Sequence, residues 1–575
     1  MPTIFDALNI GKSGLYANQM AIDTTGNNVT NANTEGYTKE SAVMTTDTPM
    51  PTSYGAFGTG VKIAEIQSAR NDLIDKSLRS SINDEAYYDK MNSSMDRLQS
   101  VFNEMSGVGL KDSMDEFFSS WHALALNPDL ETARQQVLDK GQTLTSNINY
   151  AYNSLSKLKN DLDNEVGYTV TQINNIAKQI AHLNYEIKKG ELGDNEHANT
   201  LRDQRGVLLN NLYKLSNVDV MYKAYDANSQ PEMTILVGGM PIVSGDSYNE
   251  LVARKSNGSL YNSVDFVEKN GEMVDITNKI RGGSLGAILN MRDNVIDKYQ
   301  NELDTMSSSM IQNINKIHAS GTGLTAYKQI VGEYSLKSED AELNSSNATG
   351  FDIAVKTGSL NVKITDDNGN NIGTFAVNVN GNDKFSDLRD SFNNILHDYA
   401  SMNLSNINSG RVQIVAKSGY NISFTYDSSN FLAAAGINTF FSGHSAKDMK
   451  INDVVLNDPS KIAAGKTLTP GDSSNAEAIA QVQLKKIMVD NTQSIDEYYN
   501  AFLGKIGSEA QGYSNILTSK QSIVKQIKAQ QQSIEGVSLD AEAASLIKFQ
   551  RAYQASAKFI SIVNEMTKTL IGMVQ

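Results

Sequence analysis

The interior of the chain carries one uninterrupted helical pattern, DLETARQQVLDKGQTLTSNINYAYNSLSKLKNDLDNEVGYTVTQINNIAKQIAHLNYEIKK (residues 129–189). No proline interrupts it, and its apolar residues recur at helical spacing; they are Leu144, Ile148, Leu155, Leu162, Val166, Ile173, Ile180 and Ile187. A helix of about 60 residues is roughly 90 Å long at 1.5 Å per residue. The stretch therefore predicts a rod, kinked at most at Gly167, and an elongated helical bundle around it.

Helical patterns continue on both sides of this rod. We expect helices over residues 70–105, 110–126, 198–216, 285–318 and from 475 to the C-terminus, with short strands within 218–276. The predicted fold class is mainly α with a β insert. The predicted body of the molecule, residues 36–329 and 471–534, is a helical bundle with short β segments.

The segment 330–470 differs from the rest of the chain. It contains LNVKITDDNGNNIGTFAVNV (residues 360–379), an alternating strand pattern around a hairpin turn at Asn368-Gly369, and one short helix at 387–400. We expect a β-rich inserted outer domain over 330–470. Because it leaves and rejoins the helical body, we expect it to fold as a unit whose residues 350–465 a short linker can replace.

Both ends of the chain carry seven-residue apolar repeats, which are typical of coiled-coil seams. We predict that residues 1–35 and 535–575 pair as a terminal coiled-coil domain. The seam residues are Ile4, Leu8, Leu15, Ile22, Val29, Leu539, Leu546, Phe549, Tyr553, Ile560, Val563 and Leu570. Polar residues such as Asn18 and Thr567 interrupt the seams, so we expect the pairing to be weak in a single chain.

Composition excludes several classes of protein. The 575 residues include 50 Lys and Arg against 65 Asp and Glu, a net charge of −15 that disfavours nucleic-acid binding. With no cysteine there are no disulfides or Cys-ligated metals. No apolar run is long enough for a transmembrane helix, and the N-terminus does not resemble a cleaved signal peptide. We expect no membrane insertion.

Three short strings imitate functional motifs. Gly11-Lys12-Ser13 lacks the first glycine of a phosphate-binding loop, and Gly282–Gly286 reads G-x-S-x-G without a buried strand before it. Asp366–Asn370 lacks the later ligands of a calcium loop. The six histidines are scattered. We therefore expect no catalytic, metal-binding or cofactor-binding residues, and no enzyme.

The two ends then show a family resemblance. GNNVTNANTEGYTKE (Gly26–Glu40) resembles the N-terminal signature of bacterial flagellar axial proteins, and FQRAYQASAKFISIVNEMTKTL (Phe549–Leu570) resembles their C-terminal signature. Internal stretches at 172–184, 200–212, 282–293 and 530–540 are similar to the hook-associated protein 1 family. The signature residues carried over from the resemblance are Asn31, Asn33, Gly36, Tyr37, Gln550, Arg551 and Tyr553.

This resemblance implies a structural subunit at the junction between hook and filament of the bacterial flagellum. It implies export by the flagellar type III system without a cleaved signal, and assembly as a homo-oligomeric ring outside the cell. The implied partners are the hook protein, the second junction protein (hook-associated protein 3), and a cytoplasmic export chaperone on the C-terminal helical region. Two alternatives stay open: another axial protein, such as a hook or rod subunit, and an adhesin-like protein on an axial frame.

Overall fold

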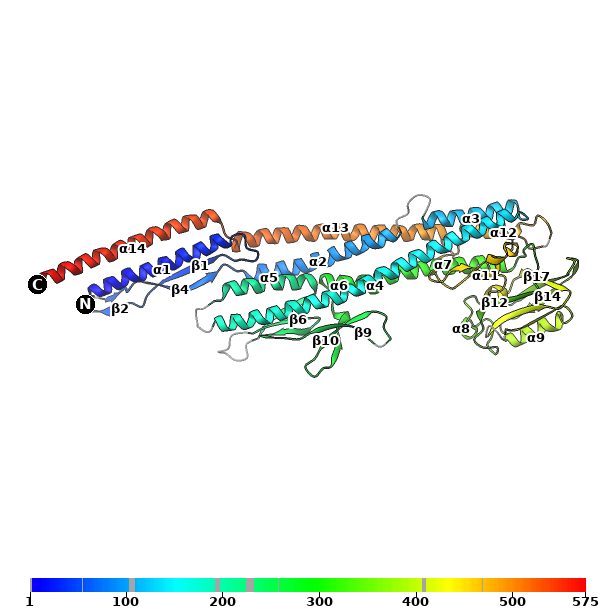
Figure 1. Ribbon diagram of the computed structural model, residues 1–575, viewed down its shortest axis with the longest axis horizontal. Helices are drawn as coiled ribbons and strands as arrows, with labels where there is room; N and C mark the ends of the chain where they lie inside the picture. Colours follow the sequence, from blue (N-terminus) through cyan, green and yellow to red (C-terminus); the bar gives the residue numbers. More distant parts are fainter. Residues whose placement is uncertain are drawn as a thin grey trace. The chain divides into compact units, whose positions relative to one another are not determined.

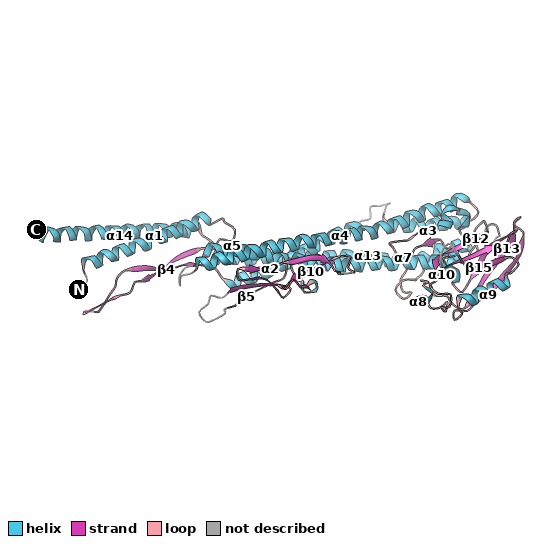
Figure 2. Cartoon of the chain, turned by 60° about the horizontal axis from the view of Figure 1, so that its bottom comes forward, coloured by secondary structure: helices cyan, strands magenta, loops and turns pink. Residues whose placement is uncertain are grey.

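The computed structural model describes residues 3–53, 55–102, 109–191, 197–223, 232–256, 258–405, 410–467 and 469–574. Residues 1, 2 and 575 of the expected terminal domain thus lie outside the described part of the chain. Long helices alternate with small antiparallel sheets (Figures 1 and 2). This confirms the mainly helical fold class with β-rich segments.

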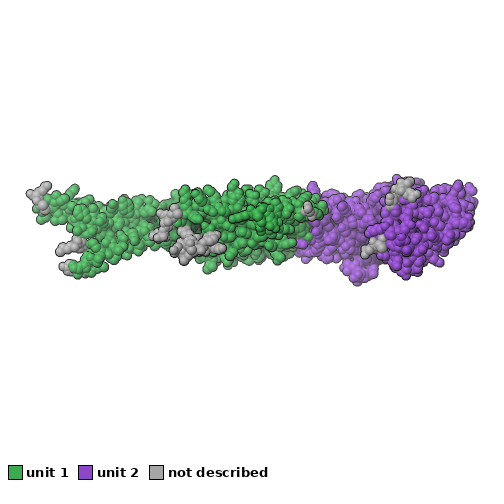
Figure 3. All heavy atoms as spheres, turned by 90° about the horizontal axis from the view of Figure 1, so that it is seen from below, with its two compact units in different colours: residues 1–94, 160–293, 511–575 green, residues 95–159, 294–510 purple. Residues whose placement is uncertain are grey.

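The chain divides into two compact units, coloured separately in Figure 3. Unit 1 comprises residues 1–94, 160–293 and 511–575, and unit 2 comprises residues 95–159 and 294–510. The helices α2 (Asp72–Val101), α4 (Glu131–Gly190) and α13 (Ile495–Glu535) contribute residues to both. These two units have other boundaries than the three domains expected from the sequence, and those domains stay a prediction.

Unit 1 contains the two ends of the chain and three small sheets with the orders β1-β4, β5-β6-β7-β8 and β11-β10-β9, besides the hairpin β2-β3. Its remaining elements are α1 (Ile4–Asn31), β1 (Glu40–Thr46), β2 (Met50–Thr52), β3 (Gly55–Phe57), β4 (Val61–Ser68), α5 (Asn199–Leu215), β5 (Val218–Lys223), β6 (Glu232–Val237), β7 (Met240–Ser244), β8 (Ser247–Tyr248), β9 (Leu251–Lys255), β10 (Asn262–Val267), β11 (Met273–Asp275), α6 (Gly283–Asn290) and α14 (Leu539–Val574).

Apolar contacts on one side and polar contacts on another hold α2 to its neighbours in unit 1. Leu78 and Ile82 of α2 pack on Val524 of α13. On another side, the amide of Asn83 donates to the backbone oxygens of Tyr213 (2.6 Å) and Ser216 (2.8 Å) at the end of α5. These bonds satisfy carbonyls that a helix C-terminus leaves without an intrahelical partner. The C-terminal end of α5 therefore lies beside α2 at Asn83.

Unit 2 contains two three-stranded antiparallel sheets, β12-β16-β15 and β14-β13-β17. Its remaining elements are α3 (Leu110–Leu126), α7 (Ile296–Ala319), β12 (Gln329–Ser335), α8 (Ser346–Thr349), β13 (Gly358–Asp366), β14 (Asn371–Val379), α9 (Phe385–Ile395), β15 (Ala400–Leu404), β16 (Arg411–Ala416), β17 (Tyr420–Asp427), α10 (Phe431–Ala435), β18 (Phe441–Ser442), β19 (Lys450–Ile451), α11 (Asp453–Asn457) and α12 (Ser474–Ala480). The hairpin turn predicted at Asn368-Gly369 is confirmed, with Gly369 in the left-handed region at φ 84°.

An aromatic cluster forms the helical core of unit 2. Trp121 of α3 is fully buried, and its ring lies 5.2 Å from that of Phe440 and 6.2 Å from that of His318, measured between centroids. Phe440 and Phe441 follow the β-rich segment, yet the Asn315 side chain on α7 accepts from the backbone N–H of both. The segment that follows the two three-stranded sheets therefore completes the core between α3 and α7.

Two expected helices differ in the structure. The predicted helix from 475 onward is wrong between α12 and α13, where residues 484–494 are non-helical. Val489, Asp490 and Asn491 all have positive φ there, a conformation that local apolar spacing does not reveal. The predicted helix at 387–400 starts earlier and ends at Ile395, because Ala400 begins β15.

His318 is held as a neutral imidazole inside this core. Its Nδ1 lies 2.8 Å from the backbone oxygen of Asn438, and the N–H of Ala463 donates to Nε2 (3.0 Å). Nδ1 therefore carries the proton and Nε2 accepts. Burial, opposed by the hydrogen bond to Asn438 and aided by the nearby Arg134 guanidinium, lowers the pKa of His318 to about 4.

We expect the stability of unit 2 to fall as the pH drops from about 7.5 to about 5. Unfolded, His318 takes up a proton near its ordinary pKa of 6.5, but folded it does so only near 4. Its contribution is therefore complete above 6.5 and is lost toward 4, a loss of about 2 kcal/mol by about pH 5. Urea unfolding followed by the fluorescence of Trp121, the single tryptophan, measures this. The His318→Gln variant should lack this part of the pH dependence, and an unchanged pH profile in the variant would contradict the assignment.

Candidate assembly site on the terminal helices

The two ends of the chain pack against each other. Helix α1 lies antiparallel beside α14 (Figure 1). A Cβ atom added at Gly11 would lie 2.6 Å from Cγ1 of Ile560, and one added at Gly14 would lie 2.9 Å from Oγ of Ser556. Both distances are shorter than real Cβ contacts, so the missing side chains of these two glycines set how closely the helices approach.

The buried residues of α1 are all small or polar. They are Gly11, Ala17, Ala21, Thr24, Thr25 and Asn28. A fully buried Leu or Ile side chain contributes about 1.5–3 kcal/mol, and α1 buries neither type fully. The opposite side of α1 contacts the β1 and β4 hairpin, where the N–H of Val61 donates to Oγ of Ser13 (3.2 Å). The contact of α1 with α14 is therefore close but weak.

One buried amide joins α1 to the following hairpin and to α14. Asn28 is 1% exposed. Its Nδ2 donates to the backbone oxygen of Glu40 (2.8 Å) and to Oε2 of Glu542 (3.0 Å). Its Oδ1 accepts from the N–H of Glu40 (2.9 Å) and from the hydroxyl of Tyr37 (2.8 Å). All four hydrogen-bonding positions of the amide are thus used, which orients it uniquely.

The charge of Glu542 is matched in the same place. Glu542 is 2% exposed in the first turn of α14, and Nζ of Lys39 lies 2.9 Å from its Oε1. Burial, together with Glu40, Asp203 and Glu542, raises the pKa of Tyr37. The Tyr37 hydroxyl therefore stays protonated and remains a donor to Asn28. The buried carboxylate is thus compensated by Lys39 and Asn28, and loss of either partner would be costly.

A second set of bonds ties the same hairpin to the helices of unit 1. The N–H and hydroxyl of Thr38 donate to the two carboxylate oxygens of Asp203 on α5 (2.8 and 2.9 Å). Burial raises the pKa of Asp203 despite these bonds. At the end of α13, the backbone oxygen of Glu535 accepts from the N–H of Lys39 (2.8 Å), and its side chain accepts from the N–H of Asn71 (2.6 Å). Residues 37–40 are thus the point where the terminal helices meet the bundle.

The predicted seam residues lie at varied depths. Val563 is buried at 4% exposure. Half-buried members are Ile4, Leu8, Leu15, Ile22, Leu546, Phe549 and Ile560, and exposed members are Val29, Leu539, Tyr553 and Leu570. The structure brings Ile560 onto Gly11, whereas the exposed four lie on the outside of the pair.

The signature residues fall into two groups. Asn31, Gly36 and Tyr37 have local roles: Asn31 bonds to Asn27, Gly36 has φ 78° and sits against Val207, and Tyr37 bonds to Asn28. Asn33, Gln550, Arg551 and Tyr553 are exposed. Sequence reasoning missed Asn28, Asp203 and Glu542. The only local signals were the position of Asn28 inside the N-terminal signature and the acidic first turn of α14.

Apolar side chains cover the outside of the helix pair. On α14 the exposed ones are Leu539, Ile547, Tyr553, Phe559, Ile562, Met566, Leu570, Ile571 and Met573, and on α1 they are Phe5, Tyr16, Met20 and Val29. Met566 and Ile571 are 55% and 59% exposed. So many exposed apolar side chains on two neighbouring helices make this surface a candidate interaction site.

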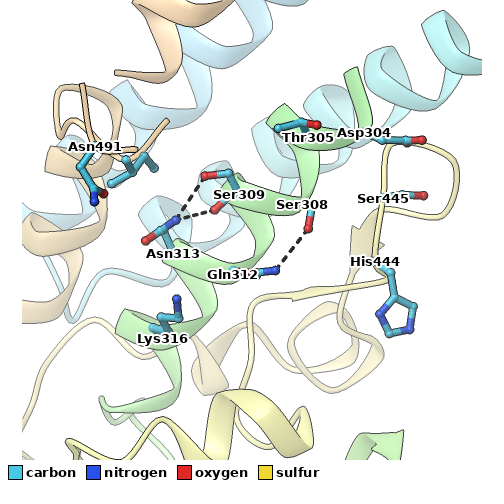
Figure 4. A pocket seen from close by; sticks show the side chains of 11 residues that line it. Asp304, Thr305, Ser308, Ser309, Gln312, Asn313, Lys316, His444, Ser445 and Asn491 are labelled. Carbon is cyan, nitrogen blue, oxygen red and sulfur yellow. Dashed lines mark hydrogen bonds between the residues drawn. The ribbon is translucent and has the colours of Figure 1, made fainter. Parts of the chain in front are cut away.

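Unit 2 has an open polar groove of about 610 Å³ along α7 (Figure 4). The bonds between its lining side chains run along the helix, from Gln312 to Ser308 and from Asn313 to Ser309. His444 at its edge pairs with Asp352, and no groove hydroxyl bonds to this histidine in the described part of the chain. The groove thus shows no activated nucleophile.

The described residues contain neither a metal-binding cluster nor a membrane-spanning helix. No group of three or more His, Cys, Asp or Glu residues could hold a metal ion there. Among the same residues, every helix is too short or too polar to cross a membrane.

Comparison with known proteins gives matches at both ends and in the interior. Residues 95–332 match the model of the flagellar hook-associated protein FlgK helical domain. Residues 8–38 match that of the flagella basal body rod protein, and residues 524–573 match the flagellar basal body rod FlgEFG protein C-terminal model. Flagellar hook-associated protein 1 of Escherichia coli (strain K12) is 26% identical over 98% of this chain and 99% of its own. The protein of that name from Bacillus subtilis (strain 168) is 26% identical over 100% of this chain and 99% of its own.

The chain belongs to the flagellar hook-associated protein 1 family. The fold agrees with this: the structure of the flagellar hook junction protein FlgK from Burkholderia pseudomallei aligns with a TM-score of 0.51 at 16% identity, over 80% of this chain and 100% of its own. Members of the hook-associated protein 1 family are structural proteins of the flagellum. The expectations of this family and of a non-enzymatic protein are therefore confirmed.

We expect the variant Gly11→Val to loosen the terminal helices. The added side chain would collide with Ile560, whereas valine at Gly26, with no neighbour within 4 Å, would meet open space in the same helix. Both variants change helix propensity by a similar amount, which makes Gly26→Val the matched control. Amide hydrogen exchange in residues 4–31 and 539–574 should accelerate about tenfold more in Gly11→Val, the equivalent of about 1.4 kcal/mol. Equal exchange in the two variants would show that the close contact does not matter.

Proposed function

We propose that this chain is the structural subunit that joins the hook to the filament of the bacterial flagellum. The observation that carries the proposal is the glycine-spaced pair of terminal helices whose outer surface is apolar. Those apolar side chains are exposed within the described part of a single chain and suit contact with neighbouring subunits. The similar structure from Burkholderia pseudomallei is that of a hook junction protein, which supports this location over a hook or rod subunit.

The proposed assembly is a ring of copies outside the cell, between the hook protein and the second junction protein, hook-associated protein 3. In it, the predicted seam residues would form coiled-coil contacts. The seam members left exposed by the pair, Val29, Leu539, Tyr553 and Leu570, would contact other subunits. Removing their apolar surface from water would contribute about 25 cal/mol per Å².

Weak pairing within one chain also suits the proposed route of export. A chain that passes through the flagellar type III system without a cleaved signal must travel unfolded. Because α1 buries only small and polar residues, opening the terminal pair costs little, and neighbouring subunits restore the stability on assembly. The exposed apolar face of α14 is the proposed binding site of the cytoplasmic export chaperone before export.

We expect Met566→Asp combined with Ile571→Asp to abolish filament growth while leaving the folded chain intact. Both side chains are more than half exposed, so the carboxylates stay in water in the free chain but would be buried in an assembly. Cells with the double variant should carry hooks without filaments and release flagellin into the medium. Electron microscopy and analysis of the culture medium provide the measurement.

The control is Gln554→Asp, an exposed polar position on the same helix, which should leave filaments normal. Measuring how much of each variant chain reaches the medium distinguishes a defect in assembly from a defect in export. Normal filaments in the double variant would contradict the assembly surface. Failure of the variant chain to reach the medium would instead place the defect at export, the result expected if this face binds the chaperone and not neighbouring subunits.

A further inference from the structure

The outer face of the sheet β14-β13-β17 forms a second groove, of about 460 Å³. Its lining residues are Asn361, Lys363, Thr374, Thr425, Tyr426, Lys466 and Thr467. This volume lies within the range of small-ligand sites. The groove lies in unit 2, apart from the polar groove on α7, and shares no lining residue with it.

The charge of this groove is opposite to that of the chain. Its lining contains two lysines and no carboxylate, although acidic residues outnumber basic ones by 65 to 50 overall. Neither Lys363 nor Lys466 forms an ion pair within the described part of the chain. Two ammonium groups without an anionic partner on one sheet face favour a negatively charged ligand.

The same face of the sheet carries, outside the groove lining, a buried hydroxyl without a hydrogen-bond partner. Ser423 is directly opposite Lys363 in the pairing of β17 with β13, so both side chains lie on the same face of the sheet. Its neighbours Ile422 and Phe424 face the hydrophobic core on the other side. Ser423 is 2% exposed, and its Oγ has no hydrogen-bond partner. A buried hydroxyl without a partner costs free energy unless a ligand or water satisfies it.

The edge of the groove combines a fixed loop with an exposed ring. Oδ2 of Asp472 accepts from the N–H of Lys466 (2.9 Å), the N–H of Thr467 (2.7 Å) and the hydroxyl of Thr467 (2.7 Å), which holds this loop in place. The carboxylate is thus occupied by the loop's own donors. Tyr426, opposite Asn361 in the sheet, is 47% exposed and offers a flat apolar surface at the groove.

We propose that this groove binds an acidic sugar. The two ammonium groups would pair with its carboxylate or sulfate, and the Asn361 amide and the Thr374 hydroxyl would bond to its hydroxyl groups. The C–H face of the ring would pack on Tyr426, whose π face carries partial negative charge. Together these groups match a ring that has one anionic substituent and several hydroxyls.

The test is titration of the full-length chain with four probes, followed by calorimetry. 3′-Sialyllactose carries a carboxylate, a heparin-derived hexasaccharide carries sulfates, lactose is the neutral control, and inorganic phosphate is the anion without a sugar. We expect at least one acidic sugar to bind about tenfold or more tightly than lactose or phosphate. Whichever acidic sugar binds identifies the anionic group as carboxylate or sulfate.

Variants locate the binding. Lys363→Ala with Lys466→Ala should weaken it about tenfold or more, and Tyr426→Ala and Thr374→Ala should each weaken it severalfold. Lys486→Ala, at an exposed lysine outside the groove, is the matched control and should bind normally. Unchanged Trp121 fluorescence verifies that each variant is folded. Absence of binding to both acidic sugars, equal binding of lactose or phosphate, or binding that survives the double lysine variant would overturn the proposal.

Discussion

The terminal helices depend on the buried amide of Asn28. Four hydrogen bonds attach this one side chain to Tyr37, Glu40 and Glu542, and so hold the end of α1, the start of β1 and the start of α14 together. A buried amide missing one partner would cost about 1–3 kcal/mol. Because all its partners are present only in this arrangement, the amide fixes the register of a pair whose other contacts are small side chains with little preference of their own.

The two units differ in what stabilises them. Unit 2 has a dense apolar core around Trp121 and Phe440. Its buried Arg134 is 2% exposed, and the guanidinium donates hydrogen bonds to the backbone oxygens of Pro128 and Ile462. The terminal pair in unit 1 relies on polar bonds at one end and on glycines at the other. Low local stability of this kind permits local unfolding, which the proposed export and assembly would require.

Local periodicity predicted much of the fold from sequence. The long helix expected over 129–189 is α4, Glu131–Gly190, and the alternating pattern around Asn368-Gly369 is the hairpin of β13 and β14. What the sequence did not show depends on distant partners. Asn28 and Glu542 are 514 residues apart, and Thr38 and Asp203 are 165 apart. No spacing rule connects such pairs. The left-handed turn at Val489–Asn491 was missed because valine rarely adopts it.

The return path of the chain limits how independent the β-rich segment is. Residues after α10 do not belong to the two three-stranded sheets. Phe440 packs on Trp121, the backbone of Asn438 and Ala463 bonds to His318, and the Ile462 oxygen accepts from Arg134. Replacing residues 350–465 by a linker would remove all of these from the helical core. It would leave Nη1 of Arg134 and both ring nitrogens of His318 without these partners, at a cost of several kcal/mol. Any segment that can be exchanged without unfolding unit 2 must therefore end before Asn438.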